Sequence, residues 1–187
     1  MHPSFGPTNY AFSTGTGIGG GTPIKTDGVF YVNSETHLSD IIDGTSNTIA
    51  ISESNLGESG NASRDPQTAY KSTFAAPLSD NACRAFNTWN YADPRGFSWV
   101  NGEYRNGLFN TYYPPNSTMP DCLTPFPGGG PPMVCTPFGF KTARSRHPGG
   151  VNIMRADGST AFLGQEIELK VWREISTRMG REVTDAF

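Results

Sequence analysis

The stretch from Val151 to Leu163 has the sequence VNIMRADGSTAFL. Two short apolar-rich runs flank Asp157-Gly158, and a glycine at this place accepts the positive φ that tight hairpin turns require. The stretch therefore predicts a β-hairpin, with Asp157 and Gly158 at its turn.

The segment that follows the hairpin has the spacing of an amphipathic helix. Its apolar residues are Ile167, Val171, Trp172 and Ile175. They occupy one face of a helix of about three turns from Glu166 to Arg178, and Gly180 is placed to end it. We expect this to be the only long helix, with Trp172 packed onto the sheet.

Shorter elements are expected before the hairpin. Residues 28–32 are predicted to form a strand after the Asp27-Gly28 turn, and residues 37–43 a single helical turn. Asp43-Gly44 forms a second turn, and the alternation of polar and apolar residues over 48–53 predicts a half-buried strand.

Composition supports one turn-rich, mostly β domain over residues 1–187. The chain has 22 Gly and 15 Pro, which interrupt helices, and 12% aromatic but only 17% charged residues, which argues against disorder. We divide it into a Gly-rich segment (1–26), a loop-dominated aromatic-rich region (54–145) and the hairpin with its helix (146–187). The expected fold class is α+β, mostly β: an antiparallel sheet with long Gly/Pro-rich loops and one C-terminal amphipathic helix.

Several classes of function are disfavoured. The net charge of -3 gives no basic footprint for nucleic acid, and no apolar run is long enough to span a membrane. The sequence from Gly15 to Gly20 fits G-x-G-x-x-G, but Pro23 follows and no helix opens there, so we do not expect nucleotide binding. There is no G-x-S-x-G, HExxH or P-loop motif.

Three cysteines occur, at positions 83, 122 and 135. Cys122 and Cys135 bracket the loop LTPFPGGGPPMV, and a disulfide there would contribute about 3 kcal/mol and indicate an oxidising, exported location. The alternative is three buried thiols in a cytosolic protein. The spacing contains no CxxC pair that would favour a metal site.

His147 and Asp157, ten residues apart, are either an acid–base or metal-ligand pair or structural residues of the loop and the turn. We favour the structural role and predict no catalytic residue. Asp40, Asp43 and Glu53 are weak candidates for a calcium site, because calcium accepts carboxylates in flexible geometry. Otherwise we expect no cofactor.

Two further features remain open. Asn61 and Asn116 begin N-x-S/T sequons and are candidate glycosylation sites. The aromatic residues from Trp89 to Tyr113 build either a secondary core or a stacking face for polysaccharide.

The stretch from Ser145 to Ser159 resembles the "H-X9-DG" signature of the DUF1559 proteins, with His147 and Asp157-Gly158 in the motif positions. These are pilin-like, type II pseudopilin-related proteins. Other blocks follow the family's order: DGVFY from Asp27, IDGTSNT from Ile42 with Glu53, PPNS from Pro114, and the segment from Trp172 to Val183. Together they span most of the chain.

This resemblance implies an exported, pilin-like globular domain at the cell surface. Family members typically begin with a prepilin leader and a long hydrophobic helix. We expect this chain to lack that helix and to correspond to the family's C-terminal portion, so that assembly uses sheet edges or the Gly-rich segment.

The predicted function is a non-enzymatic, self-assembling subunit of an extracellular filament or surface assembly. Alternatives are a secreted polysaccharide-binding module, a pseudopilin of a type II-like secretion system, or a hydrolase that uses His147 with a carboxylate. Asp27-Gly28, Asp43-Gly44 and Asp157-Gly158 are expected to set turns and His147 to anchor a loop by hydrogen bonding.

Overall fold

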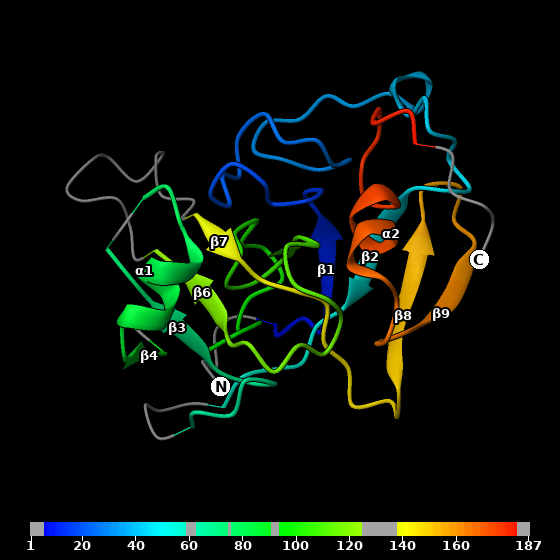
Figure 1. Cartoon of the computed structure of the whole chain (residues 1–187). Coiled ribbons are helices and arrows are strands. Elements are labelled where there is room, and N and C mark those ends of the chain that lie inside the picture. Colours follow the sequence, from blue (N-terminus) through cyan, green and yellow to red (C-terminus); the bar gives the residue numbers. More distant parts are fainter. Residues whose placement is uncertain (1–5, 59–62, 75, 91–93, 125–137, 183–187) are drawn as a thin grey trace.

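The structure, a computed structural model, describes residues 6–58, 63–74, 76–90, 94–124 and 138–182. Within these ranges the chain forms two β-sheets and three short helical segments, which confirms the mostly β, α+β fold class. In Figure 1 the two sheets occupy opposite sides of the molecule.

The larger sheet has five strands. They are β1 (Tyr10–Ser13), β2 (Ile49–Glu53), β5 (Leu108–Phe109), β8 (Gly150–Arg155) and β9 (Thr160–Gly164), in the spatial order β5-β1-β2-β8-β9. All neighbours are antiparallel except β1 and β5. The expectation of a purely antiparallel sheet is therefore wrong, because the long middle region crosses over and returns a strand parallel to β1.

The smaller sheet has four strands and belongs to the region that was expected to be loop-dominated. They are β3 (Tyr70–Ser72), β4 (Thr88–Trp89), β6 (Asp121–Leu123) and β7 (Gly139–Phe140), in the order β4-β3-β6-β7, with β3 and β6 parallel. Strands of two or three residues are too short to leave a periodic pattern, so the sequence does not predict this sheet.

The predicted hairpin is confirmed by the pairing of β8 with β9. Gly158 has a φ of 85° in the turn, and the Asp157 carboxylate accepts a hydrogen bond from the Ser159 backbone N–H at 2.9 Å. The hydrogen bonds with Ser159 lower the pKa of Asp157 below its ordinary value. The roles predicted for Asp157 and Gly158 in the hairpin turn are therefore confirmed.

The C-terminal helix is shorter than predicted. α2 spans Leu169–Glu174, and the residue before it, Glu168, has a non-helical backbone conformation with φ -57° and ψ 130°. At its end the hydroxyls of Ser176 and Thr177 donate to the carbonyls of Arg173 and Glu174, at 2.7 and 3.0 Å. The backbone N–H groups of Ser176 and Thr177 bond the same two carbonyls, at 3.1 and 3.2 Å. These bonds span three residues rather than four, so the last turn tightens and the helix ends well before Gly180.

Three other local expectations have mixed outcomes. A single 3-10 turn, η1 (Leu38–Asp40), lies within the expected 37–43. Residues 28–32 form no strand. They run beside the end of β1 and are held there by isolated hydrogen bonds, such as that from the Phe30 N–H to the Ser13 carbonyl. α1 (Asp80–Ala85) is not predicted, although Ser79 caps it by accepting from Ala82 N–H.

The main core lies between the five-stranded sheet and α2 (Figure 1). Its buried members are Ala11, Ile49, Phe109, Ala143, Val151, Ile153, Leu163, Trp172 and Ile175. Trp172 is fully buried, and its indole N–H donates to the Tyr113 carbonyl at 3.0 Å.

None of the helices in the described ranges has the length and hydropathy that a membrane span requires.

The disulfide joins Cys83 on α1 to Cys122 on β6. The predicted Cys122–Cys135 pairing is therefore wrong, and Cys135 lies outside the described residues. The pairing was predicted from proximity in sequence, whereas the second sheet brings together two cysteines that are 39 positions apart. The bridge ties α1 to the smaller sheet.

The positive φ at Gly158 gives a test of the hairpin turn. Gly158→Val should lower the free energy of unfolding by about 1 kcal/mol or more, because a β-branched residue resists this conformation. An added Cβ meets nothing within 4 Å at Gly158 or at Gly102, and only Gly158 has a positive φ. Gly102→Val is thus a matched control, and equal losses in urea unfolding would contradict the assignment.

The disulfide pairing predicts a peptide map. Trypsin should release peptide 72–84, which contains Cys83, joined to peptide 106–141, which contains the other two cysteines. The Cys135→Ser variant should keep this link. The double variant Cys83→Ser with Cys122→Ser should lower the free energy of unfolding by about 2–5 kcal/mol. A free peptide 72–84 from the non-reduced protein would exclude the pairing.

Candidate functional site

A polar cleft opens where β2 ends beside the loop that leads into β8. Its volume is about 520 Å³, and its lining includes Glu53, Asn55, Ser145, Arg146 and His147. Two separate family-like blocks, the one that contains Glu53 and the one that begins at Ser145, thus meet at one place.

Glu53 is the centre of the contacts in this cleft. Its carboxylate accepts a hydrogen bond from the backbone N–H of Asn152 at 2.8 Å and lies 3.2 Å from Nε2 of His147. Partial burial raises the pKa of Glu53, but the hydrogen bonds from Asn152 and Ser145 and the charge of His147 outweigh it and lower the pKa. The carboxylate therefore joins β2, β8 and the 145–147 loop.

The partner of His147 is not the one that the sequence pattern offered. Asp157 lies in the hairpin turn and bonds to Ser159, whereas His147 contacts Glu53. The Ser145 hydroxyl accepts the backbone N–H of His147 at 3.1 Å. An activated serine gives its proton to an imidazole nitrogen; here the Ser145 side chain and Nε2 of His147 both face the Glu53 carboxylate.

Asp27 holds the Gly-rich segment against residues 27–28. Its carboxylate accepts the backbone N–H of Thr16 at 2.9 Å and also the Thr16 hydroxyl. Gly28 has no positive φ, but an added Cβ would lie 2.1 Å from the Gly15 backbone nitrogen. Gly28 therefore permits a close approach of two backbone segments, rather than the turn expected from the sequence.

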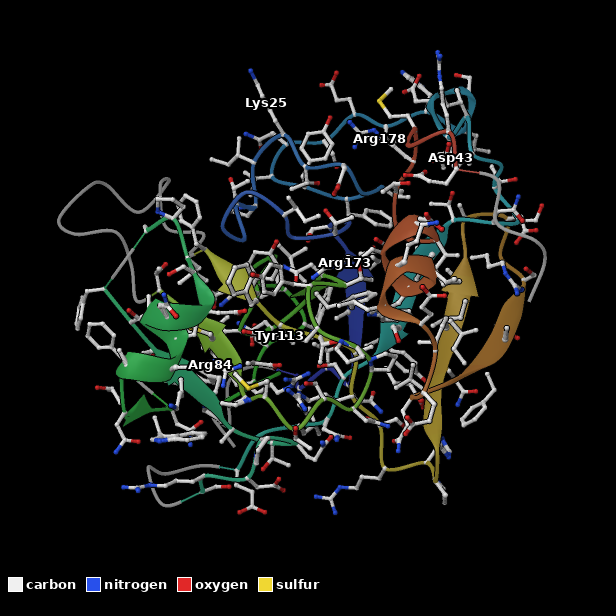
Figure 2. The ribbon with its side chains drawn as sticks, in the orientation of Figure 1. Lys25, Asp43, Arg84, Tyr113, Arg173 and Arg178 are labelled. Atoms are coloured by element: carbon white, nitrogen blue, oxygen red, sulfur yellow. A yellow bond between two sulfur atoms is a disulfide. The ribbon has the colours of Figure 1, made fainter. Side chains whose placement is uncertain are left out.

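Asp43 performs a similar role for the C-terminal segment. It accepts hydrogen bonds from the Thr177 hydroxyl at 3.0 Å and from the backbone N–H groups of Gly180 and Arg181, both at 2.7 Å. Arg178 donates to the carbonyls of Thr26 and Gly28, at 2.6 and 2.5 Å. Figure 2 shows Asp43 and Arg178 at the same end of the molecule.

The three candidate calcium ligands have separate partners. Asp40 accepts the backbone N–H of His37 at the start of η1, Asp43 binds the C-terminal segment and Glu53 lies in the cleft. In the part of the chain that the structure describes, no group of three or more His, Cys, Asp or Glu side chains could hold a metal ion. The expected grouping of these three residues is therefore wrong.

The aromatic residues between Trp89 and Tyr113 divide into two sets. Phe97, Tyr104, Phe109 and Tyr113 are buried. Trp89 and Tyr112 are partly buried, Trp99 is 70% exposed, and Tyr91 lies outside the described residues. Four of the seven described aromatic residues thus build the interior, and burial raises the pKa of Tyr104 to about 12.

Of the two sequon asparagines, Asn61 lies outside the described residues. Asn116 is partly buried, and its side-chain amide donates to the Gly150 carbonyl at 3.1 Å and accepts from the Ser145 N–H at 2.8 Å. Asn116 thus holds its loop against the start of β8, and its glycosylation stays a prediction.

A cluster of buried charges joins the two sheets, and sequence reasoning missed it. Asp121 on β6 pairs with Arg95 and with Arg144, whose Nη2 lies 3.0 Å from its carboxylate. Arg95 also donates to the Ser54 hydroxyl and the Asn55 carbonyl, immediately after β2. Arg95 and Arg144 lie in irregular segments and Asp121 begins a strand of three residues, so no local pattern distinguishes them from solvated side chains.

The cluster has more positive than negative groups. Lys141, also fully buried, donates to the Asn106 carbonyl at 2.7 Å. Burial and the neighbouring charge of Arg95 lower the pKa of Lys141 well below its ordinary value, and burial lowers that of Arg144 to about 9. Asp121 is therefore the carboxylate on which two buried guanidinium groups depend.

The outer face of the five-stranded sheet is largely apolar. Its side chains, here called the open face, are Tyr10, Phe12, Ile51, Glu53, Asn152, Met154, Thr160 and Phe162. Tyr10 is 55%, Phe12 41% and Phe162 52% exposed. A groove of about 530 Å³ lies among Tyr10, Ile51 and Met154.

Residues 2–170 match the DUF1559 family, which is described as a protein of unknown function. The chain belongs to the DUF1559 family. The comparisons with curated proteins and with solved structures find no match. Within this DUF1559 protein, the family-like blocks recognised in the sequence supply Asp27, Asp43, Glu53 and His147, all of which contact other segments of the chain.

The buried charge cluster gives a strong mutational test. Asp121→Asn should lower the free energy of unfolding by about 3–5 kcal/mol, because it leaves two buried guanidinium groups without their counter-charge. Glu166→Gln, at an exposed position, is the control and should change it by less than about 0.5 kcal/mol. Urea unfolding of the disulfide-intact proteins measures both, and a loss below 1 kcal/mol for Asp121→Asn would contradict the assignment.

Proposed function

We propose that this DUF1559 protein is a structural, pilin-related subunit of an extracellular filament or surface assembly, without catalytic activity or cofactor. Copies of the chain associate with one another, and the open face of the five-stranded sheet takes part in the contacts. The protein acts outside the cell.

The observation that carries this proposal is the apolar character of the open face. Tyr10, Phe12 and Phe162 are each more than 40% exposed on one side of one sheet. The opposite side of the same sheet is buried against Trp172 and Ile175. Apolar side chains exposed together on one face of a folded protein favour association, because their burial releases water from the apolar atoms.

The roles of the family-like residues support a structural function. Asp27, Asp43 and Asp157 accept backbone N–H groups, and Glu53 accepts both a backbone N–H and the His147 imidazole. Such contacts stabilise long loops. The Cys83–Cys122 disulfide supports an exported location, since disulfides persist in oxidising compartments.

The alternatives have less support. A sugar-binding face in the Trp89–Tyr113 region would need exposed coplanar rings, and four of its aromatic residues are buried. The hydrolase hypothesis needs a nucleophile coupled to the imidazole of His147, and Nε2 of this imidazole faces Glu53. The role of a secretion-system pseudopilin stays a prediction.

Light scattering after size-exclusion chromatography, with negative-stain electron microscopy, tests the proposal on the non-reduced chain. We expect oligomers whose mass rises with concentration. Tyr10→Thr with Met154→Thr should reduce the mass, because the variant removes apolar surface from the open face while keeping residues that favour strands.

Phe74→Thr is the matched control, because Phe74 is 72% exposed but lies after β3 in the smaller sheet. It should assemble as the wild type does. A wild-type chain that stays monomeric over the whole concentration range, or a control that loses assembly as the face variant does, would contradict the proposal.

A further inference from the structure

At the outer edge of the five-stranded sheet, β9 has backbone groups that pair with no other described residue. The hydrogen bonds from Arg155 N–H to the Ser159 carbonyl and from Gln165 N–H to the Gly149 carbonyl, both 2.8 Å, show that odd-numbered residues face β8. The N–H and C=O groups of Thr160, Phe162 and Gly164 therefore point away from the sheet. Among the described residues only the Gly164 carbonyl has a partner, the N–H of Ile167 at 3.1 Å.

Three features that usually prevent pairing are missing from the strand at this edge. The strand TAFLG contains no charged residue and no proline, and its pairing with β8 has no bulge. Proteins commonly protect exposed edges with such features. The opposite edge of the sheet differs, because β5 has two buried residues and the next residue, Asn110, donates its N–H to the Lys141 carbonyl.

We propose that β9 pairs with β9 of a second copy of the chain, antiparallel about a two-fold axis at Phe162. In this register the Phe162 N–H of each copy donates to the Phe162 carbonyl of the other. The Gly164 N–H of each copy donates to the Thr160 carbonyl of the other. A two-fold interface requires a surface complementary to itself, and a strand whose outward groups are centred on one residue meets that requirement.

The side chains also favour a second copy as the occupant. Phe162 lies on the open face, and directly opposite residues of antiparallel strands project to the same face. The two Phe162 rings would therefore lie side by side, and no like charges would face each other along the strands. The open faces of the two copies would then lie on the same side of one joined sheet. This inference rests on the proposed function and names one of its contacts.

Cysteine cross-linking tests the register. In a Cys135→Ser background, Phe162→Cys should form a covalent dimer under copper-phenanthroline-catalysed air oxidation, because this residue faces its own copy. Thr160→Cys alone and Gly164→Cys alone should not cross-link, but their mixture should. An added Cβ at Gly164 has ample room, with its nearest atom 3.9 Å away. Phe74→Cys is the control and should stay monomeric, although Phe74 is more exposed than Phe162, at 72% against 52%.

Two variants of Phe162, the residue at the axis, separate the contribution of the backbone hydrogen bonds to dimer stability from that of the phenyl ring. Phe162→Thr keeps the outward N–H, whereas Phe162→Pro removes it from both copies without affecting a bond to β8. The proline variant should weaken the dimer by roughly 100-fold more than the threonine variant, for two lost hydrogen bonds. Sedimentation measures the dimer, and circular dichroism checks that each variant is folded.

The outcomes separate this inference from the proposed function. If the wild type assembles but Phe162→Cys does not cross-link above the Phe74→Cys control, or Phe162→Pro assembles as Phe162→Thr does, the β9 contact is wrong and self-assembly stands. If the wild type and all variants are monomeric, both are wrong. Cross-linking of Thr160→Cys alone as efficiently as Phe162→Cys would exclude the proposed register.

Discussion

The buried ion cluster around Asp121 is the interaction on which the two-sheet arrangement depends. Asp121 lies on the smaller sheet, and its partner Arg95 also bonds to the residues that follow β2 in the larger sheet. Arg144 extends the cluster to the carbonyls of Ser117 and Met119. Because unpaired buried charges are costly, the cluster tolerates few other placements of these segments, and it fixes the position of β2 beside the loop that contains His147.

Long loops are held in this protein by carboxylates that accept backbone hydrogen bonds. Asp27 holds the Gly-rich segment, Asp43 holds the residues after α2, and Glu53 holds the loop before β8. A chain rich in Gly and Pro forms few regular hydrogen-bonded elements, so side chains must supply partners for the remaining backbone groups. The family-like blocks therefore coincide with the places where segments distant in sequence are joined.

The five-stranded sheet combines this internal order with an exposed apolar face and an exposed edge. Its inner face packs against α2, and its open face retains exposed aromatic rings. At the edge, most outward backbone groups of β9 have no partner among the described residues. The ring of Phe162 belongs to both the open face and the edge. The proposed association at β9 would therefore satisfy hydrogen bonds and bury apolar surface with the same residue.

The sequence by itself determined the local features: the Asp157-Gly158 hairpin, the strand at 49–53, the helical turn near residue 40 and the apolar face that contains Trp172. These depend on neighbouring residues, so a short window contains their cause. Only the tertiary structure decided the Cys83–Cys122 pairing, the Glu53–His147 contact, the parallel strand pairs and the buried ions around Asp121. Each joins segments whose proximity is a property of the whole packed chain, and no local pattern encodes which distant partner a cysteine or a charge will meet.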